Sequence, residues 1–173
     1  TPFYGASGGQ VGDTGEITGP TGAATVTDTL KPLPALTVMA VAVNSGELFL
    51  DSEITLTVTE GARTASARNH TATHLLDYAL RETLGTHIEQ KGSFVGPDYF
   101  RFDFSHFAKV TDEELRQVEH RVNQLIRADY PLEEKRDATM DEAKAMGAIA
   151  LFGEKYGDKV RVVRVGDVSM ELC

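Results

Sequence analysis

The sequence predicts an α+β protein with a small β-barrel-like domain at residues 1–62 and a sheet-plus-helix domain at residues 63–173. Residues 1–62 are rich in Gly, Thr and Val and show no helical period. The second part contains two stretches in which apolar side chains recur every three to four positions. Alternating apolar and polar residues return near the end of the chain, where they predict further strands.

Short alternating runs in the first part predict its strands. The run at residues 53–59 is the clearest, because Ile54, Leu56 and Val58 alternate with threonines. Short strands with regular turns are typical of a small barrel or a strongly curved sheet. The other predicted strands are residues 23–30, 36–43 and 47–50.

The second part begins with a helix predicted at residues 67–84, with Ser66 as its N-cap and Gly85 at its end. Thr111 and Thr139 are each followed three positions later by Glu, a capping-box pattern that predicts two further helices. The remaining predictions are a hairpin at residues 93–95 and 99–105, a solvated connection at 133–137, and strands at 160–165 and 168–173.

Composition limits the kind of protein this is. A chain of 173 residues that is 41% apolar can bury a core. No apolar run approaches the roughly 20 residues that span a bilayer, so we expect no membrane partner. The single cysteine cannot form an internal disulfide and suits the cytoplasm. A net charge of −9 argues against a general nucleic-acid coat. Because the chain starts without Met and stops directly after a strand pattern, we expect a fragment.

His70 and His74 carry the strongest chemical signal. Four residues apart on the predicted helix, they lie roughly 40° apart on one face, away from the apolar arc that includes Leu76. With Cys173 they offer the nitrogen and sulfur ligands that zinc prefers, and water or a later residue would complete the set. Thr71 stands where a metalloprotease motif needs Glu. The alternative interpretation is two ordinary surface or core histidines.

Two further features are candidates for binding. Ser7, Gly8, Gly9 and Gln10 form a glycine-rich loop whose backbone can approach a ligand closely, although tight turns alone explain the glycines equally well. No Gly-Lys-Ser/Thr follows, so the loop is not a P-loop. Gln90 offers both donors and an acceptor to a hydroxyl-bearing substrate, but a solvated turn residue is the alternative.

Seven stretches of the chain form an ordered series. They are TPFY at residues 1–4, SGGQ at 7–10, RNHTATHLL at 68–76, QKGS at 90–93, RFDFSH at 101–106, GAIALFGEKYGD at 147–158 and SMELC at 169–173. Together they resemble the editing region of alanyl-tRNA synthetase over essentially the whole chain. The resemblance implies hydrolysis of tRNA(Ala) wrongly charged with serine or glycine. A second hydrolytic site is the natural remedy when an alanine pocket cannot reject such small side chains on size.

The resemblance also implies roles for particular residues. The zinc ligands would be His70, His74, Cys173 and a histidine that follows the cysteine in the family motif, after the point where this chain ends. Gln90 and Thr73 would act in editing, where we expect them to recognise the serine hydroxyl. The implied partners are the charged acceptor end of tRNA(Ala) and the rest of the synthetase, whose ATP-binding and ligase parts we expect before residue 1. As substrate-binding residues we expect Ser7, Gly8, Gly9, Gln10, Arg101 and Asp103.

Two other functions fit the same residues. The chain could be a non-catalytic tRNA-docking module in which zinc only supports folding, so that chelation would unfold it. It could also be an unrelated zinc hydrolase of small molecules, which would need a general base; Asp77 and Glu171 are the nearby carboxylates. Candidate cations for a tRNA surface, or simply solvated charges, are Arg63, Arg68, Arg81, Lys91 and Arg101.

Overall fold

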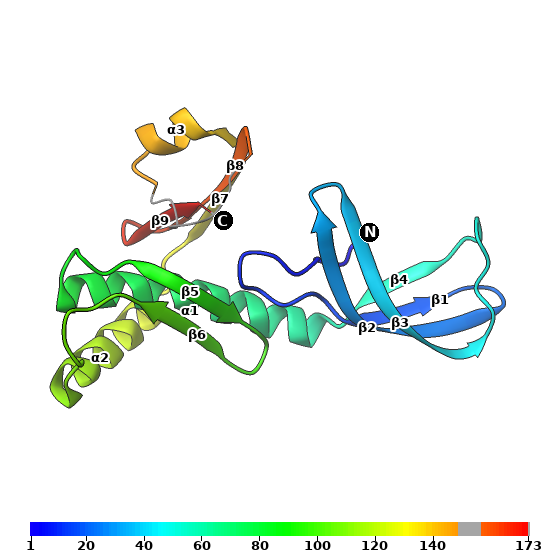
Figure 1. Ribbon diagram of the computed structural model, residues 1–173, viewed down its shortest axis with the longest axis horizontal. Helices are drawn as coiled ribbons and strands as arrows, with labels where there is room; N and C mark the ends of the chain where they lie inside the picture. Colours follow the sequence, from blue (N-terminus) through cyan, green and yellow to red (C-terminus); the bar gives the residue numbers. More distant parts are fainter. Residues whose placement is uncertain (149–156, 173) are drawn as a thin grey trace. The chain divides into compact units, whose positions relative to one another are not determined.

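The computed structural model describes residues 1–148 and 157–172 of the chain (Figure 1). These residues form two compact units. The N-terminal unit comprises Thr1–His70 and Phe94–Phe100, and the C-terminal unit comprises Thr71–Ser93 and Arg101–Cys173. Antiparallel sheets and three helices make up the described residues, which confirms the predicted α+β class.

The N-terminal unit is built on one antiparallel sheet with strand order β3-β2-β1-β4. In the described part of the chain β3 and β4 are the two edges, so the sheet is open and the expected barrel is wrong. Closure requires the first and last strands of the sheet to pair with each other, whereas among the described residues β3 pairs with β2 and β4 pairs with β1. The strands are β1 (Gly15–Thr18), β2 (Gly22–Leu33), β3 (Leu36–Gly46) and β4 (Thr55–Val58).

Several strand predictions for this unit are confirmed, and one is wrong. The predicted strands at residues 23–30 and 36–43 belong to β2 and β3, and the run at 53–59 contains β4. Residues 47–50 form no strand; the Glu47 N–H instead donates to the Thr21 carbonyl at 3.1 Å. Strand β1 escaped prediction because Ile17 is its single large apolar residue. Ile17 packs in the core of this unit with Phe3 and Val26.

Helix α1 (Glu60–Leu84) begins before its predicted cap, Ser66, which lies buried inside the helix. Its early start is compatible with Glu60, since an acidic side chain in the first turn interacts favourably with the helix dipole. The predicted end is confirmed. Gly85 has a φ of 116°, which favours glycine, and its N–H donates to the Arg81 carbonyl at 3.0 Å.

The C-terminal unit contains α1 from Thr71 onward and the elements that follow it, except residues 94–100 around the turn of the β5–β6 hairpin, which belong to the N-terminal unit. Both predicted capping boxes are confirmed, with Thr111 and Thr139 as N-caps. The predicted solvated connection at residues 133–137 is wrong, because it lies in β7, a charged and exposed edge strand paired with β8. The elements are β5 (Gln90–Val95), β6 (Phe100–Phe104), α2 (Asp112–Ala128), β7 (Leu132–Thr139), α3 (Met140–Ala145), β8 (Lys159–Val165) and β9 (Ser169–Leu172).

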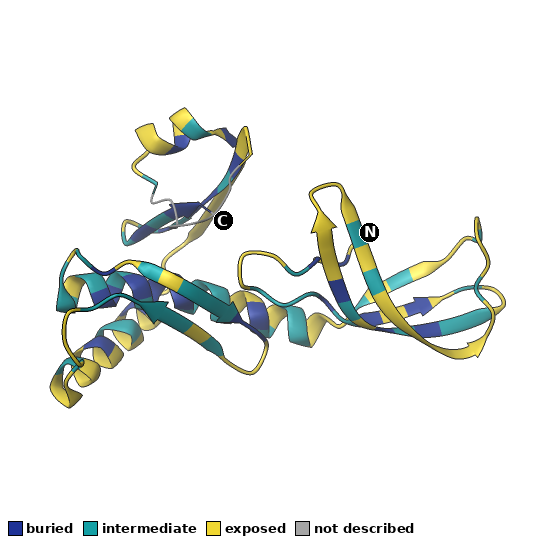
Figure 2. Ribbon diagram, in the orientation of Figure 1, coloured by how far each residue is buried: buried dark blue, intermediate teal, exposed yellow. Residues whose placement is uncertain are grey.

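In the three-stranded sheet β7-β8-β9 the buried residues lie mainly on β8 and β9, where dark blue is prominent in Figure 2, whereas β7 is exposed apart from Ala138. One face packs Val162 and Leu172 against Ala143 of α3. The opposite face places Val165 against Leu75 of α1 and Leu125 of α2. Within the described residues no helix has both the length and the apolar character needed to cross a bilayer.

The packing between α1 and α2 can be tested by mutation. Ile88 is fully buried there among Ala79, Leu80 and Val118. Because Ile88→Ala leaves a cavity, we expect it to lower the free energy of unfolding by about 2–5 kcal/mol. The matched control is Ile126→Ala, since Ile126 is 51% exposed on α2; its expected change is about 0.5 kcal/mol or less. Urea unfolding followed by circular dichroism measures both, and equal losses would contradict this packing.

Candidate functional site

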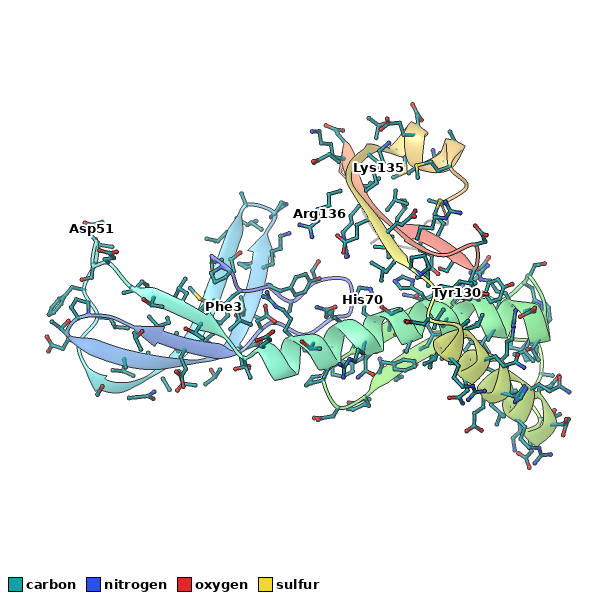
Figure 3. All side chains as sticks on the ribbon, turned by 180° about the vertical axis from the view of Figure 1, so that it is seen from behind. Phe3, Asp51, His70, Tyr130, Lys135 and Arg136 are labelled. Atoms are coloured by element: carbon teal, nitrogen blue, oxygen red, sulfur yellow. The ribbon has the colours of Figure 1, made fainter. Side chains whose placement is uncertain are left out.

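Helix α1 carries both histidines on consecutive turns, as predicted, and Figure 3 labels His70 on this helix. The expectation that the pair points away from the buried face is wrong for His74, which is only 6% exposed. The physical reason is the C-terminal sheet: Leu75 packs against Val165 of β8, and Glu171 of β9 contacts the His74 ring. Sequence periodicity identified one apolar arc and could not anticipate a second partner for the opposite side.

The glycine-rich loop lies beside His70 within the N-terminal unit. The Gln10 side-chain oxygen Oε1 is 2.8 Å from His70 Nδ1. Ser7 and Gln10 exchange backbone hydrogen bonds of 2.9 and 3.2 Å across a turn in which Gly8 and Gly9 have φ values of 56° and 80°. These angles favour glycine and explain both residues. The turn therefore fixes the side chain that contacts the histidine.

A buried carboxylate anchors the segment that leads out of this loop. Asp13 accepts hydrogen bonds from the Tyr4 N–H at 2.5 Å and from Arg63 of α1. Arg63 also donates to the Pro2 carbonyl at 2.6 Å. The hydrogen bond to Asp13 raises the pKa of the Arg63 guanidinium, and the charge of Asp13 adds to this effect against the cost of burial. The loop and α1 are thus joined by a charge-assisted contact.

His74 is held by Glu171 in the C-terminal unit. Its Nδ1 lies 2.6 Å from Glu171 Oε2, and the Ser169 hydroxyl donates to Glu171 Oε1 at 2.8 Å. All three residues are buried. Burial alone would raise the pKa of the Glu171 carboxyl, but the hydrogen bonds from His74 and Ser169 and the charge of His74 outweigh it, so the pKa lies below its usual value.

Both imidazoles therefore present Nδ1 to an oxygen acceptor. When Nδ1–H donates to such an oxygen, the ring lone pair resides on Nε2. A histidine that binds zinc commonly has this arrangement, because the second nitrogen bonds a carboxylate or carbonyl oxygen that fixes the ring. The chemistry of this pair of donors fits zinc. Cys173 lies outside the described residues, among which no cluster of three His, Cys, Asp or Glu side chains is close enough to hold a metal.

The other predicted site residues lie on α1 and on the β5–β6 hairpin. Thr73 is buried on α1 beside His74. Gln90 is half-buried at the start of β5 and donates from Nε2 to Ser93 Oγ at 3.4 Å, so it is part of a strand and not a solvated turn. Arg101 donates from Nε to Asp103 Oδ2 at 3.0 Å on β6. The structure thus pairs Gln10 with His70 and Arg101 with Asp103.

Most of the candidate tRNA-surface cations are paired with carboxylates, whereas Arg68 lies exposed on α1. The pairs are Arg63 with Asp13, Arg81 with Asp77, Lys91 with Glu89 and Arg101 with Asp103. Each pairing lowers the positive field that the cation would offer to phosphate, in line with the acidic composition.

Sequence reasoning missed the structural roles of Asp13 and Glu171. Glu171 entered only as a possible base of an unrelated hydrolase. The alternation in its strand did place Ser169 and Glu171 on one face, as the structure confirms by burying both. What the pattern lacked was a sign that this face meets α1. Asp13 gave no signal, since its partner Arg63 lies fifty residues later.

Comparison with known proteins gives close relatives, although no protein-family model matches the chain. Alanine–tRNA ligase of Nitratidesulfovibrio vulgaris is 58% identical over 173 residues, all of this chain and 20% of the relative. The enzyme of the same name from Oleidesulfovibrio alaskensis is 55% identical with the same coverage, and that of Bacteroides fragilis is 54% identical over 19% of its length. The chain spans about one fifth of these relatives.

The Asp13 anchor leads to a second prediction. Asp13→Asn replaces one of two acceptor oxygens by an NH₂ group that faces the Arg63 or Tyr4 donors, so the free energy of unfolding should fall by about 1–3 kcal/mol. Asp98→Asn, an exposed turn carboxylate in the same unit, is the matched control and should change it by about 0.5 kcal/mol or less. Hydrogen exchange at the Tyr4 amide reports the local effect; unchanged protection there would refute the anchoring role.

Proposed function

Because the chain belongs to the alanine–tRNA ligase family, we propose that it forms the part of such an enzyme that hydrolyses wrongly charged tRNA(Ala). The proposed substrates are the serine and glycine esters at the acceptor end of tRNA(Ala). The proposed partners are this tRNA and the remaining four fifths of the ligase chain, which would attach alanine to tRNA using ATP. The proposed location is the cytoplasm, where charged tRNA is consumed.

The observation that carries this proposal is the anchoring of both helix histidines through Nδ1. Gln10 holds His70 at 2.8 Å and Glu171 holds His74 at 2.6 Å. When each Nδ1–H donates to these oxygens, the lone pairs of the two rings lie on Nε2 one helical turn apart, which is the arrangement expected for a shared metal ion. A structural or surface histidine pair needs no such matched orientation.

Zinc is the proposed cofactor, held by His70 and His74 Nε2, by Cys173 Sγ, and by a histidine that follows in the family pattern. When bound, zinc would supply a Lewis acid that activates water or orients the ester and amine. The chain's own residues would do the remaining work. Gln10 and Glu171 would fix the rings, and the loop at residues 7–10 would form a wall of the substrate site.

Discrimination is assigned to Gln90 and Thr73, with Arg101 and Asp103 as substrate-binding residues. The Gln90 amide already donates to a hydroxyl, that of Ser93, at the long distance of 3.4 Å. A serine substrate could offer its own hydroxyl to the same amide. A site that hydrogen-bonds a hydroxyl can separate serine from alanine far better than a pocket that only measures size.

The two alternatives receive different support. Glu171 holds one hydrogen bond on each oxygen, from Ser169 and His74. This suits a residue that orients a ligand and not the general base that a small-molecule hydrolase would need. The docking-module alternative differs from editing only in what the metal does, so chelation separates the two.

Editing is tested by deacylation of Ser-tRNA(Ala), with Ala-tRNA(Ala) as the control ester, in the longer ligase chain that continues past Cys173. We expect selective hydrolysis of the serine ester when zinc is bound, and loss of hydrolysis with retained circular dichroism after chelation. Gln90→Ala should reduce this hydrolysis, whereas Gln117→Ala, an exposed glutamine on α2, should not. Zinc binding with both esters intact, or unfolding on chelation, would favour the docking module.

The role of Glu171 yields a separate prediction about metal affinity. Glu171→Gln keeps the shape and an acceptor oxygen but removes the charge that makes His74 a stronger ligand. Zinc affinity should fall on the order of 10- to 100-fold. Competition with a chromophoric chelator measures it, and Glu119→Gln on the exposed face of α2 is the matched control. Equal affinities in the two variants would remove Glu171 from the metal site.

A further inference from the structure

The C-terminal unit contains a pocket of about 310 Å³. It is lined by Glu171 and by the part of α1 that follows His74. Its wall comes from α1, from Gly147 after α3, from the end of β8, from the turn between β8 and β9, and from β9 itself. This volume lies at the lower end of the range for small-molecule sites. The side chains that the argument uses are Asp77, Arg81, Arg164, Ser169 and Glu171.

Asp77 is the unusual residue of this pocket. It is 4% exposed, and its Oδ2 accepts a hydrogen bond from Arg81 Nε at 2.8 Å. Its Oδ1 has no hydrogen-bond partner, and in the described part of the chain it is the one buried side-chain nitrogen or oxygen in that state. Burial raises the pKa of the Asp77 carboxyl, the Arg81 hydrogen bond opposes the rise, and the charge of Glu171 adds to it. A buried acceptor without a donor is costly unless something supplies the donor.

Charges of both signs line the pocket. Asp77 and Glu171 contribute carboxylates, and Arg81 and Arg164 contribute guanidinium groups. The Arg81 hydrogen bond to Asp77 uses Nε, and its two terminal amino groups make no further hydrogen bond to the described residues. Arg164 already donates to the Gly166 carbonyl at 2.7 Å and to the Asp167 carboxylate. Arg81 is therefore the cation whose two terminal amino groups can bind a carboxylate in a bidentate manner.

This pattern selects among ligand classes. A simple anion such as phosphate would meet two buried carboxylates, and a metal cation would meet two guanidinium groups. A small molecule that carries an ammonium group next to a carboxylate satisfies both signs. Its ammonium supplies the donor that Asp77 Oδ1 lacks, and its carboxylate faces Arg81.

We propose that this pocket binds a free small α-amino acid as a zwitterion, with the ammonium group on Asp77 Oδ1 and the carboxylate on Arg81. The site is separate from the ester-hydrolysing site proposed above, and its argument requires neither zinc nor hydrolysis. Glu171 lies between the two, since it lines the pocket and holds His74. Amino acids of this size are also what the proposed hydrolysis would release.

The test is calorimetric titration of the chelator-treated chain with glycine and with serine, so that an amino acid cannot bind through a metal. We expect saturable binding that is lost for glycolate, which lacks the ammonium group, and for ethanolamine, which lacks the carboxylate. Asp77→Asn and Arg81→Gln should each raise Kd by about tenfold or more, the loss expected for one charge-assisted hydrogen bond. The controls Glu119→Gln and Arg116→Gln change exposed charges on α2 and should leave Kd unaltered.

Circular dichroism on every variant separates lost binding from lost folding, and the two pocket variants provide independent tests. Absence of saturable binding by the folded chain would overturn the proposal and leave ordered water as the donor to Asp77 Oδ1. Binding unaffected by both pocket variants would place the amino acid elsewhere and equally refute it. Deacylation of Ser-tRNA(Ala) in the longer chain tests the other proposal: hydrolysis without amino-acid binding refutes this inference alone, and binding without hydrolysis refutes only the editing function.

Discussion

The buried contact between His74 and Glu171 is the interaction on which the C-terminal unit depends. A carboxylate with so little exposure is unfavourable unless hydrogen bonds hold its charge, and the His74 ring and the Ser169 hydroxyl supply them. This requires β9 to present Ser169 and Glu171 to α1. The register does so, because it pairs these two residues with Val165 and Val163 of β8. Val165 in turn packs against Leu75, one residue along α1 from His74.

In the N-terminal unit the histidine is oriented by a neutral side chain instead of a carboxylate. His70 is oriented by the Gln10 amide, and the loop that bears Gln10 is joined to α1 by the Asp13–Arg63 contact. A carboxylate makes a histidine ligand more basic than an amide oxygen does. The two histidines, although one turn apart on the same helix, therefore have unequal electronic surroundings. Sequence spacing alone treats them as equivalent.

Local rules predicted the elements whose causes are local. The capping boxes at Thr111 and Thr139 and the glycine end of α1 follow from residues three or four apart, and all three are confirmed. Strand β7 was not predicted because most of its side chains are charged, and only its backbone pairing with β8 identifies it as a strand. The barrel prediction was wrong because closure depends on which strands pair, and the alternation within a strand does not encode its partners.

Predictions for the candidate site likewise depended on whether their causes are local. The sequence predicted that His70 and His74 lie on consecutive turns of one helix, because this follows from their spacing of four residues. Their partners Gln10 and Glu171 lie sixty and ninety-seven residues away, so the orientation of each ring follows from tertiary structure. The burial of His74 was hidden for the same reason, as it depends on a strand that forms near the end of the described chain.

The hydrogen bonding of Asp77 is not what stability of the fold alone would favour. A fold selected only for stability would be expected to give a buried carboxylate two partners or to replace it with an apolar residue of similar size. Asp77 instead has one partner, Arg81, and an oxygen that faces no donor among the described residues. Local violations of this kind concentrate at sites that act on something else, because the missing partner then comes from outside the chain. The neighbouring Glu171 makes the arrangement costlier still, since its charge also opposes ionisation of Asp77. Two buried carboxylates that line one pocket, one of them with an oxygen that lacks a donor, are easier to explain by a bound ammonium group than by the needs of the fold alone.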